Sequence, residues 1–373
     1  MNSFLEERFE RQFRLQEHHS SVSTEILAGL TTFATMGYVL AVVPHMMGEA
    51  GVPQGAMLTG MVLMIFLTSM AMGLYTNRPF ALAPGMGSVA IFSITMVQLQ
   101  NVPIGVASAI VFLSGVLFII VTVLGIRKLI VMTIPRSIKI SISAGVGIFL
   151  AVIGMRNAKL LAVNAKKVAL SFGDLTQPVV ILAAITFVIL LVLTARRVRG
   201  AALISILAGT VIGIPMGLTQ IPESIVRMPD SIAPIFFNFD LMGALDLQYL
   251  PFLFAFFLPD FFSSFGTAIG IGGKAGFLDE NGDLPGLDKV FHVDSIAATV
   301  GSFFTIPVLI TYLESGAGVE AGGRTGLTAC TTAAASASLR PSSIHLLTSL
   351  SIRENLLTIV LHVQVRSRLM NSQ

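Results

Sequence analysis

The feature that most constrains this chain is a succession of apolar runs, each long enough to cross a lipid bilayer. A transmembrane helix needs about 20 mostly apolar residues. Only 12% of the 373 residues are charged, about half the fraction found in soluble domains. The sequence therefore predicts an all-α, multi-pass membrane protein. Continuous membrane helices are expected near residues 25–47, 55–75, 103–125, 131–154, 177–195, 200–217, 248–272 and 290–308.

The basic residues predict the orientation of these helices. The net charge is +3, but Lys and Arg lie singly or in short clusters between apolar runs, which indicates membrane topology and no nucleic-acid partner. With the N-terminus inside, the loop with Lys159, Lys166 and Lys167 is the exception to a cytoplasmic placement of basic loops. We expect a cell (plasma or inner) membrane location. Residues 1–24 are expected to be a cytosolic segment, either an amphipathic helix at the membrane surface or a disordered tail.

Two apolar segments, 80–99 and 311–335, are interrupted by Gly or Pro and lie at matching places after pairs of apolar helices. Their first parts, Phe80–Gly87 and Thr311–Gly318, both end in Gly-x-Gly. Irregular backbone at membrane depth is tolerated only inside protein or beside a water-filled cavity. Such paired interruptions favour a transporter site built from two short extended stretches, each followed by a half-helix whose positive end suits an anion or a polar heterocycle. Kinks used only for packing are the alternative.

Two carboxylates within these apolar stretches are candidate functional groups. Glu314 is the stronger, because a carboxylate in the membrane is costly unless it is functional or paired; the alternative is a buried partner for Arg324. Asp260, within the run 248–272, is a candidate either for proton binding or for fixing a neighbouring helix. Ser263 and Thr267 follow on the same helix.

Other patterns indicate structure or exclude chemistry. Gly266 and Gly270 are spaced for close helix approach, and Asp294 is expected to cap or contact a helix end. The segment from Gly316 to Gly326 lacks the Gly-Lys-Ser/Thr of a phosphate-binding loop. With a single cysteine and no zinc-ligand spacing among the six histidines, no metal or cofactor is expected. No nucleophile–base arrangement is present, so the chain is not expected to be an enzyme.

Several longer motifs resemble a known family. The chain resembles the AzgA-type adenine/guanine/hypoxanthine permeases of the nucleobase–ascorbate transporter (xanthine/uracil permease) superfamily over about residues 8–330. The motifs that carry this resemblance are Glu25–Phe33, Asn77–Gly87, Ile134–Lys139 and Glu314–Ala329.

The resemblance implies two inverted seven-helix repeats divided into core and gate domains, and proton-coupled symport of nucleobases by alternating access. The first repeat would span 25–217, and the second would start over 248–335. It implies a site between the first, third, eighth and tenth helices, with Glu314 as its glutamate, and a possible homodimer in the lipid bilayer. Glu314 and Asp260 are the candidates for proton coupling. The other residues expected to bind substrate are Tyr312, Ser315, Gly316, Phe80, Ala83, Gly85, Ser263 and Thr267.

The sequence also departs from the family's pattern. The family's Asp-Thr-x-Gly-Thr is here Ser263–Thr267, and its Gly-Met-Gly-Leu-Asn is here Gly85–Val89. Asp260 is expected to take over part of the lost carboxylate's role. Residues 336–373 form an atypical polar tail, so the second repeat is expected to be incomplete, through truncation or a frameshift. The alternatives are an anion transporter of similar architecture and a truncated membrane protein that does not transport.

Overall fold

The computed structural model describes most of the chain. The described residues are 3–126, 155, 160–164, 169–196, 198, 201–218, 229–280 and 283–338. The helix expected at 131–154, the motif Ile134–Lys139 and the polar tail beyond residue 338 lie outside the described residues.

The long apolar runs form helices close to the expected bounds. They are α4 (Gln54–Thr76), α6 (Ile104–Val123), α9 (Pro178–Ala195) and α12 (Leu250–Ala275). Together with the helical stretch Val22–Glu49, the described residues contain five helices long and apolar enough to cross a membrane. The run at 200–217 forms the shorter α10 (Ala201–Gly213).

The expectation of a helix over 290–308 was wrong at its end. Helix α13 covers Leu287–Ser302 and stops six residues early. Pro307 accounts for the stop, because the residue before a proline is disfavoured in helical conformation. Thr305 also has a positive φ of 55°. The chain then runs extended into the second interrupted segment.

The first apolar run is also less regular than expected. It forms α2 (Val22–Met36) and α3 (Val39–Glu49), separated at Gly37 and Tyr38. Leu40 N–H donates to the Gly37 carbonyl three residues back, so the helix tightens locally. Pro44 lies inside α3, where it removes one backbone hydrogen bond and its ring crowds the Leu40 carbonyl.

The two interrupted segments meet in a short antiparallel ribbon, which confirms the predicted extended stretches. Strand β1 (Leu82–Pro84) pairs with β4 (Leu309–Thr311), with Ala83 opposite Ile310. Helix α5 (Met86–Ala90) follows β1 and continues as a π-helix over Ile91–Leu99. Helix α14 (Ser315–Glu320) follows β4, and α15 (Gly326–Ser338) comes after a short turn.

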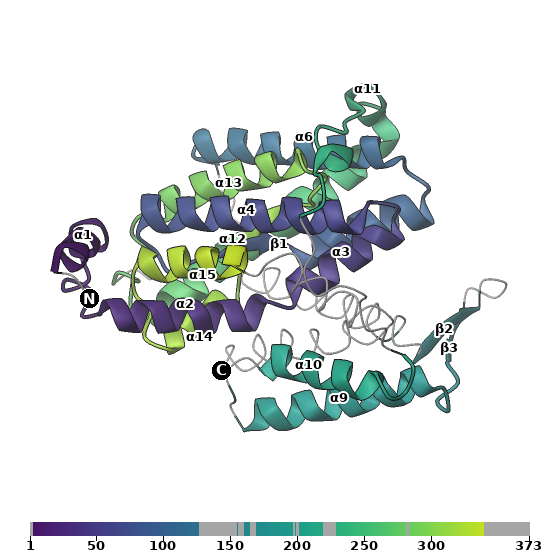
Figure 1. Ribbon diagram of the computed structural model, residues 1–373. Helices are drawn as coiled ribbons and strands as arrows, with labels where there is room; N and C mark the ends of the chain where they lie inside the picture. The colour runs from purple at the N-terminus through teal and green to yellow at the C-terminus, as the bar shows by residue number, and fades with distance from the viewer. Residues whose placement is uncertain are drawn as a thin grey trace.

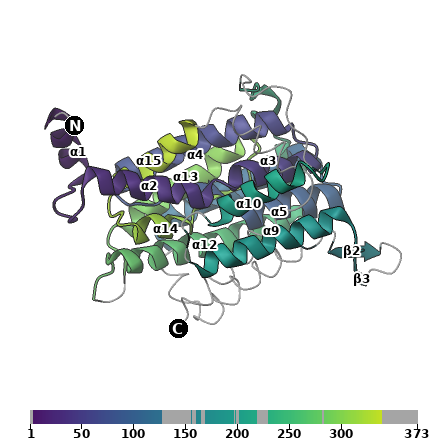
Figure 2. The same cartoon turned by 60° about the horizontal axis from the view of Figure 1, so that its bottom comes forward.

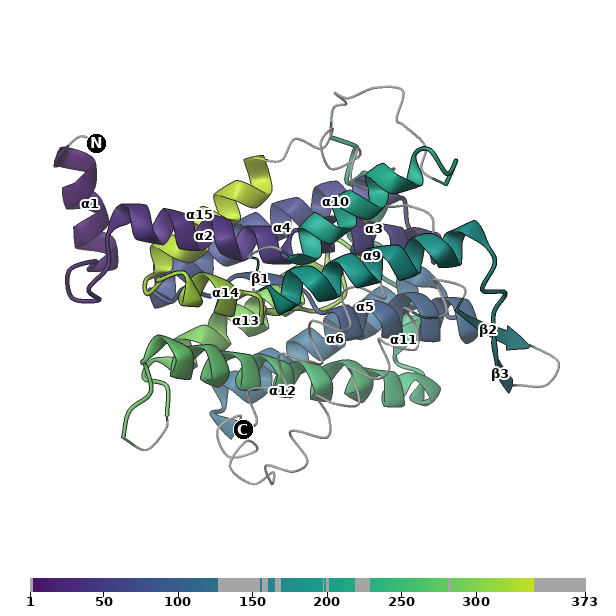
Figure 3. The same ribbon diagram turned by 90° about the horizontal axis from the view of Figure 1, so that it is seen from below.

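These elements form a bundle around the ribbon. Helices α4, α6 and α13 lie side by side, and α9 packs on α10 at another side of the molecule (Figure 1). Two further views place α14 between α2 and α12 (Figures 2 and 3). The remaining elements are α11 (Leu241–Ala244), two 3-10 turns (Ala233–Ile235 and Leu247–Tyr249) and a hairpin of β2 (Leu161–Asn164) with β3 (Ala169–Phe172).

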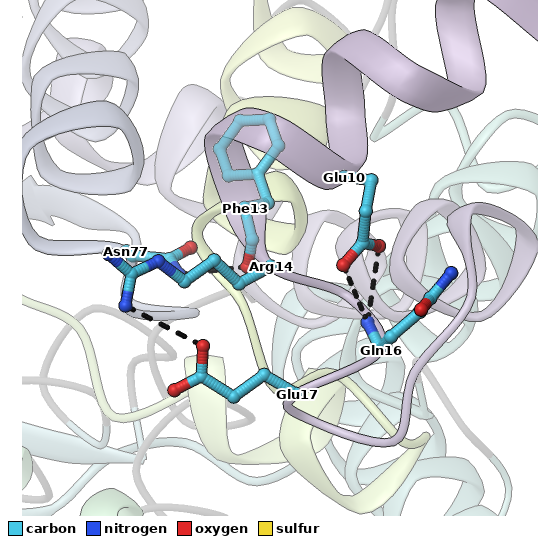
Figure 4. A network of polar contacts seen from close by, with 6 residues as sticks. All are labelled: Glu10, Phe13, Arg14, Gln16, Glu17 and Asn77. Atoms are coloured by element: carbon cyan, nitrogen blue, oxygen red, sulfur yellow. Dashed lines mark hydrogen bonds and ion pairs between the residues drawn. The ribbon is translucent and has the colours of Figure 1, made fainter.

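The N-terminal segment is a docked helix rather than a tail. Helix α1 covers Ser3–Phe13, and the Phe13 side chain is buried against residues of α2 and α15. Asn77 Nδ2 donates to the Phe13 carbonyl at 2.9 Å, and the Gln16 N–H donates to both Glu10 carboxylate oxygens at 3.2 Å (Figure 4). Arg14 and Glu17 form an exposed ion pair.

Glycines mark where helices meet, although not where the sequence predicted. A Cβ at Gly326 would overlap the Gly73 carbonyl oxygen, so α15 and α4 meet backbone to backbone. By contrast, a Cβ at Gly266 or Gly270 would meet nothing within 4 Å among the described residues. Among the described residues no element approaches α12 closely at these two glycines, and both are exposed.

Candidate binding site

The ribbon places the starts of the two half-helices at its opposite ends. Gly85 N–H donates to the Val308 carbonyl at 3.0 Å at one end, and Tyr312 N–H donates to the Ala81 carbonyl at 2.9 Å at the other. Because the strands are antiparallel, α5 and α14 leave the ribbon in opposite directions. The Ser315 hydroxyl, which is fully buried, accepts the Ala81 N–H at 2.9 Å. Ser315 thus joins the two interrupted segments.

Glu314 is the residue that directly precedes α14, and its side chain is half-buried. Its Oε1 accepts a hydrogen bond from the Tyr38 hydroxyl at 2.8 Å. That hydroxyl also lies 3.3 Å from the hydroxyl of Tyr312. The break in the first span and the β4–α14 junction therefore bring together one carboxylate and two phenols.

Tyr38 was missed by the sequence analysis. The available signal was the pair Gly37–Tyr38 in an apolar run that Pro44 already disturbs. The contact itself joins residues 276 positions apart, and no local pattern reveals such a pair.

Arg324 lies beyond the far end of α14 from Glu314. Its guanidinium Nη1 donates to the carbonyls of Val319 at 2.7 Å and Gly323 at 2.8 Å. The Val319 carbonyl lies at the C-terminal end of α14, where a cation is favourable, and the Gly323 carbonyl belongs to the turn that follows. The guanidinium therefore stabilises the turn between α14 and α15.

Asp260 lies at the other end of the ribbon, near the start of α5. The carboxylate is 5% exposed and accepts a hydrogen bond from the Ser88 hydroxyl at 2.6 Å. A Cβ at Gly85 would lie 3.3 Å from Asp260 Oδ1, so the backbone passes close to the carboxylate. On the same helix, Thr267 is buried and Ser263 is half-buried. Ser88, which the sequence analysis did not select, completes this second polar cluster.

Asp294 does not cap a helix end, contrary to expectation. It lies in the middle of α13 and is fully buried. Its Oδ1 accepts the backbone N–H of Thr311 at 2.8 Å and the Thr311 hydroxyl at 3.1 Å. Asp294 therefore fixes the end of β4, three residues before Glu314.

The remaining predicted site residues surround the ribbon. Phe80 and Ala83 are fully buried. Gly316 is buried in α14, where a Cβ would lie 3.9 Å from the Ile271 side chain of α12. The residues that the structure describes contain no group of three or more His, Cys, Asp and Glu side chains that could hold a metal ion.

Membrane-length helices packed around a buried ribbon, with a carboxylate near each end of that ribbon, are typical of a membrane transporter. The solved transmembrane domain of BicA, a cyanobacterial bicarbonate transporter, has a similar fold. The TM-score is 0.63 at 15% identity, over 93% of this chain and 88% of that one. At this identity the likeness concerns the fold.

The sequence comparisons define the family. The family model described as Permease family (Xan_ur_permease) matches residues 23–339, so the chain belongs to this xanthine/uracil permease family and is a permease rather than an enzyme. The adenine permease AdeP of Escherichia coli is 36% identical over 320 residues, covering 86% of this chain and 72% of AdeP. The guanine/hypoxanthine permease PbuO of Bacillus subtilis is 35% identical over 326 residues, covering 86% of this chain and 75% of PbuO.

Proposed function

We propose that this permease carries purine nucleobases such as adenine, guanine or hypoxanthine, and that Glu314 binds them. The observation that carries the proposal is the hydrogen bond from Tyr38 to Glu314 at 2.8 Å. A purine base has both N–H donors and ring-nitrogen acceptors. A carboxylate accepts from such donors, while phenol hydroxyls can both donate and accept. The names of the relatives AdeP and PbuO support the same substrate class.

Transport would proceed by alternating access around the ribbon. In this proposal residues 25–217 form the first repeat, and the second, inverted repeat starts over 248–335. Glu314 and Asp260 are the proposed proton-coupling groups. The chain would lie in the plasma or inner membrane with its N-terminal segment in the cytoplasm, and a homodimer is the proposed assembly.

The principal rival is an anion carrier of similar architecture, in which the positive ends of the half-helices alone would hold the substrate. The carboxylate of Glu314 argues against it, because a negative charge beside the substrate repels an anion. A nucleobase, which is neutral and rich in donors, suits this site better.

Uptake of radiolabelled adenine, guanine and hypoxanthine tests the proposal in cells that lack their own purine uptake. Glu314→Gln should lower uptake at least about tenfold, the effect of losing roughly 1.4 kcal/mol from a charge-assisted hydrogen bond. The matched control is Glu320→Gln, at the opposite end of α14, where the carboxylate is exposed and pairs with Lys274. If the correctly inserted protein takes up no nucleobase, or if Glu314→Gln equals its control, the proposal fails. Bicarbonate uptake in the same cells reports on the rival.

A further inference from the structure

One face of α2 packs against α14 and against the turn that leads from α14 to α15. Its residues recur at intervals of three or four, which places them on the same side of a helix. In Figure 2, α14 lies alongside α2. Four residues of this face lie in α2, namely Glu25, Ala28, Thr32 and Thr35, and Tyr38 continues it just before α3.

At the middle of this face, two glycines, one in α14 and one in the turn after it, let the chain approach α2 closely. A Cβ at Gly318 would overlap the Thr32 hydroxyl and lie 2.7 Å from the Ala28 carbonyl oxygen. A Cβ at Gly323 would lie 2.8 Å from the Ala28 Cβ. Contacts this close leave no room for α14 to slide along α2 without a clash.

The end of this face near α3 contacts Glu314 twice. The Thr35 hydroxyl lies 3.4 Å from the Glu314 carbonyl oxygen, and the Tyr38 hydroxyl donates to the carboxylate. These two contacts fix the position of Glu314 relative to α2.

The other end is held by Glu25, a carboxylate with 0% exposure. Its Oε1 accepts the Arg324 N–H at 2.9 Å and the Ser20 hydroxyl at 2.6 Å. Its Oε2 accepts the Thr325 N–H at 3.2 Å and the Thr328 hydroxyl at 2.5 Å. Four hydrogen bonds to one buried carboxylate form a strong, directional attachment. Three of them come from Arg324, Thr325 and Thr328, and these fix the turn between α14 and the N-terminus of α15, where negative charge is favoured.

Asn77 provides a second attachment at the same turn. Its Oδ1 accepts the Gly326 N–H at 2.8 Å, while its Nδ2 donates to Phe13. The start of α15 is thus tied to α2, to α4 and to the N-terminal segment.

We propose that Glu25 is a positioning residue for Glu314. It sets the register of α14 along α2, and this register decides where Glu314 meets Tyr38. Glu25 itself lies 13 residues before Tyr38, about 20 Å away at the rise of a helix. The inference rests on the proposed function of Glu314 and extends it to a residue distant from the site.

A double-mutant cycle on purine uptake tests this coupling. Glu25→Gln replaces one carboxylate oxygen by an N–H₂ group, which then faces other hydrogen-bond donors. The apparent KM of purine uptake should therefore rise about tenfold. In a Tyr38→Phe background the same change should raise KM less than about twofold, because the contact being positioned is already gone. The free-energy effects of substitutions at distant sites without shared partners normally add. Additive effects of the two substitutions would therefore overturn the proposal.

The matched control is Glu17→Gln, the same chemical change at an exposed residue of the N-terminal segment. It should leave KM unchanged. A fall in the amount of inserted protein, with KM unchanged in Glu25→Gln, would assign Glu25 a purely structural role and contradict the proposal.

Hydrogen exchange on the purified protein tests positioning without transport. In Glu25→Gln, exchange should accelerate both at residues 324–328 and at residues 312–316. Acceleration confined to 324–328 would show that the attachment does not reach Glu314. If the wild-type protein takes up no purine, the proposed function fails, while this measurement still decides whether Glu25 positions Glu314.

Discussion

Replacing Tyr38 by phenylalanine removes a single hydroxyl from the site. That hydroxyl donates to Glu314 Oε1 at 2.8 Å. Tyr38 is 3% exposed, so water has little access to replace the lost donor. A hydrogen bond to a charged group contributes about 1.5–3 kcal/mol. Each 1.4 kcal/mol corresponds to about a tenfold change in affinity. This energy bounds the effect on binding, because Tyr38 acts on the purine through Glu314. If all of it serves to hold Glu314 in position, the Kd for the preferred purine rises between about 10-fold and 150-fold.

The assay is purine binding to purified protein, together with the KM of uptake. Phenylalanine keeps the ring, so no large cavity forms, and the thermal unfolding temperature should stay close to that of the wild type. Tyr312→Phe is the matched comparison, and its effect should be smaller, because the Tyr312 hydroxyl lies 3.3 Å from that of Tyr38. An unchanged Kd for Tyr38→Phe, with a folded and inserted protein, would refute the reasoning.

Three further substitutions test other parts of the molecule. Asp260→Asn should retain purine binding but make uptake insensitive to a protonophore; uptake that still collapses with the proton gradient would remove Asp260 from the coupling step. Gly326→Ala should lower the unfolding temperature of the purified protein strongly, because its Cβ overlaps the Gly73 carbonyl. Gly266→Ala should change it little, because its Cβ meets nothing within 4 Å among the described residues; equal effects would contradict the packing argument. Asp294→Ala should weaken purine binding and lower the free energy of unfolding by about 1–3 kcal/mol, because it leaves the buried Thr311 N–H unpaired. Asp294→Asn keeps an acceptor oxygen and should have a milder effect; the reverse order would refute the role of Asp294 in fixing the end of β4.

The sequence predicted the structural elements that depend on residues close to one another in the chain. Helices α4, α6, α9 and α12 were expected because apolar length alone requires them in a bilayer. The two extended stretches, although not their pairing, were expected because Pro84 and the glycines around residues 85 and 316 interrupt apolar runs at matching places. Glu314 was chosen because an isolated carboxylate in an apolar stretch needs an explanation.

Only the tertiary structure showed which distant residues form hydrogen bonds with these elements. Glu25 hydrogen-bonds residues 299 to 303 positions away, and Ser88 meets Asp260 across 172 positions. Gly266 and Gly326 look alike in the sequence, yet among the described residues a Cβ at Gly266 would meet nothing within 4 Å, whereas Gly326 touches a neighbouring backbone. A sequence records apolar length, helix breaks and isolated charges, which depend on neighbours along the chain. Partners for buried polar groups depend on packing, which brings distant segments together, and this is why Tyr38 and Glu25 emerged only from the fold.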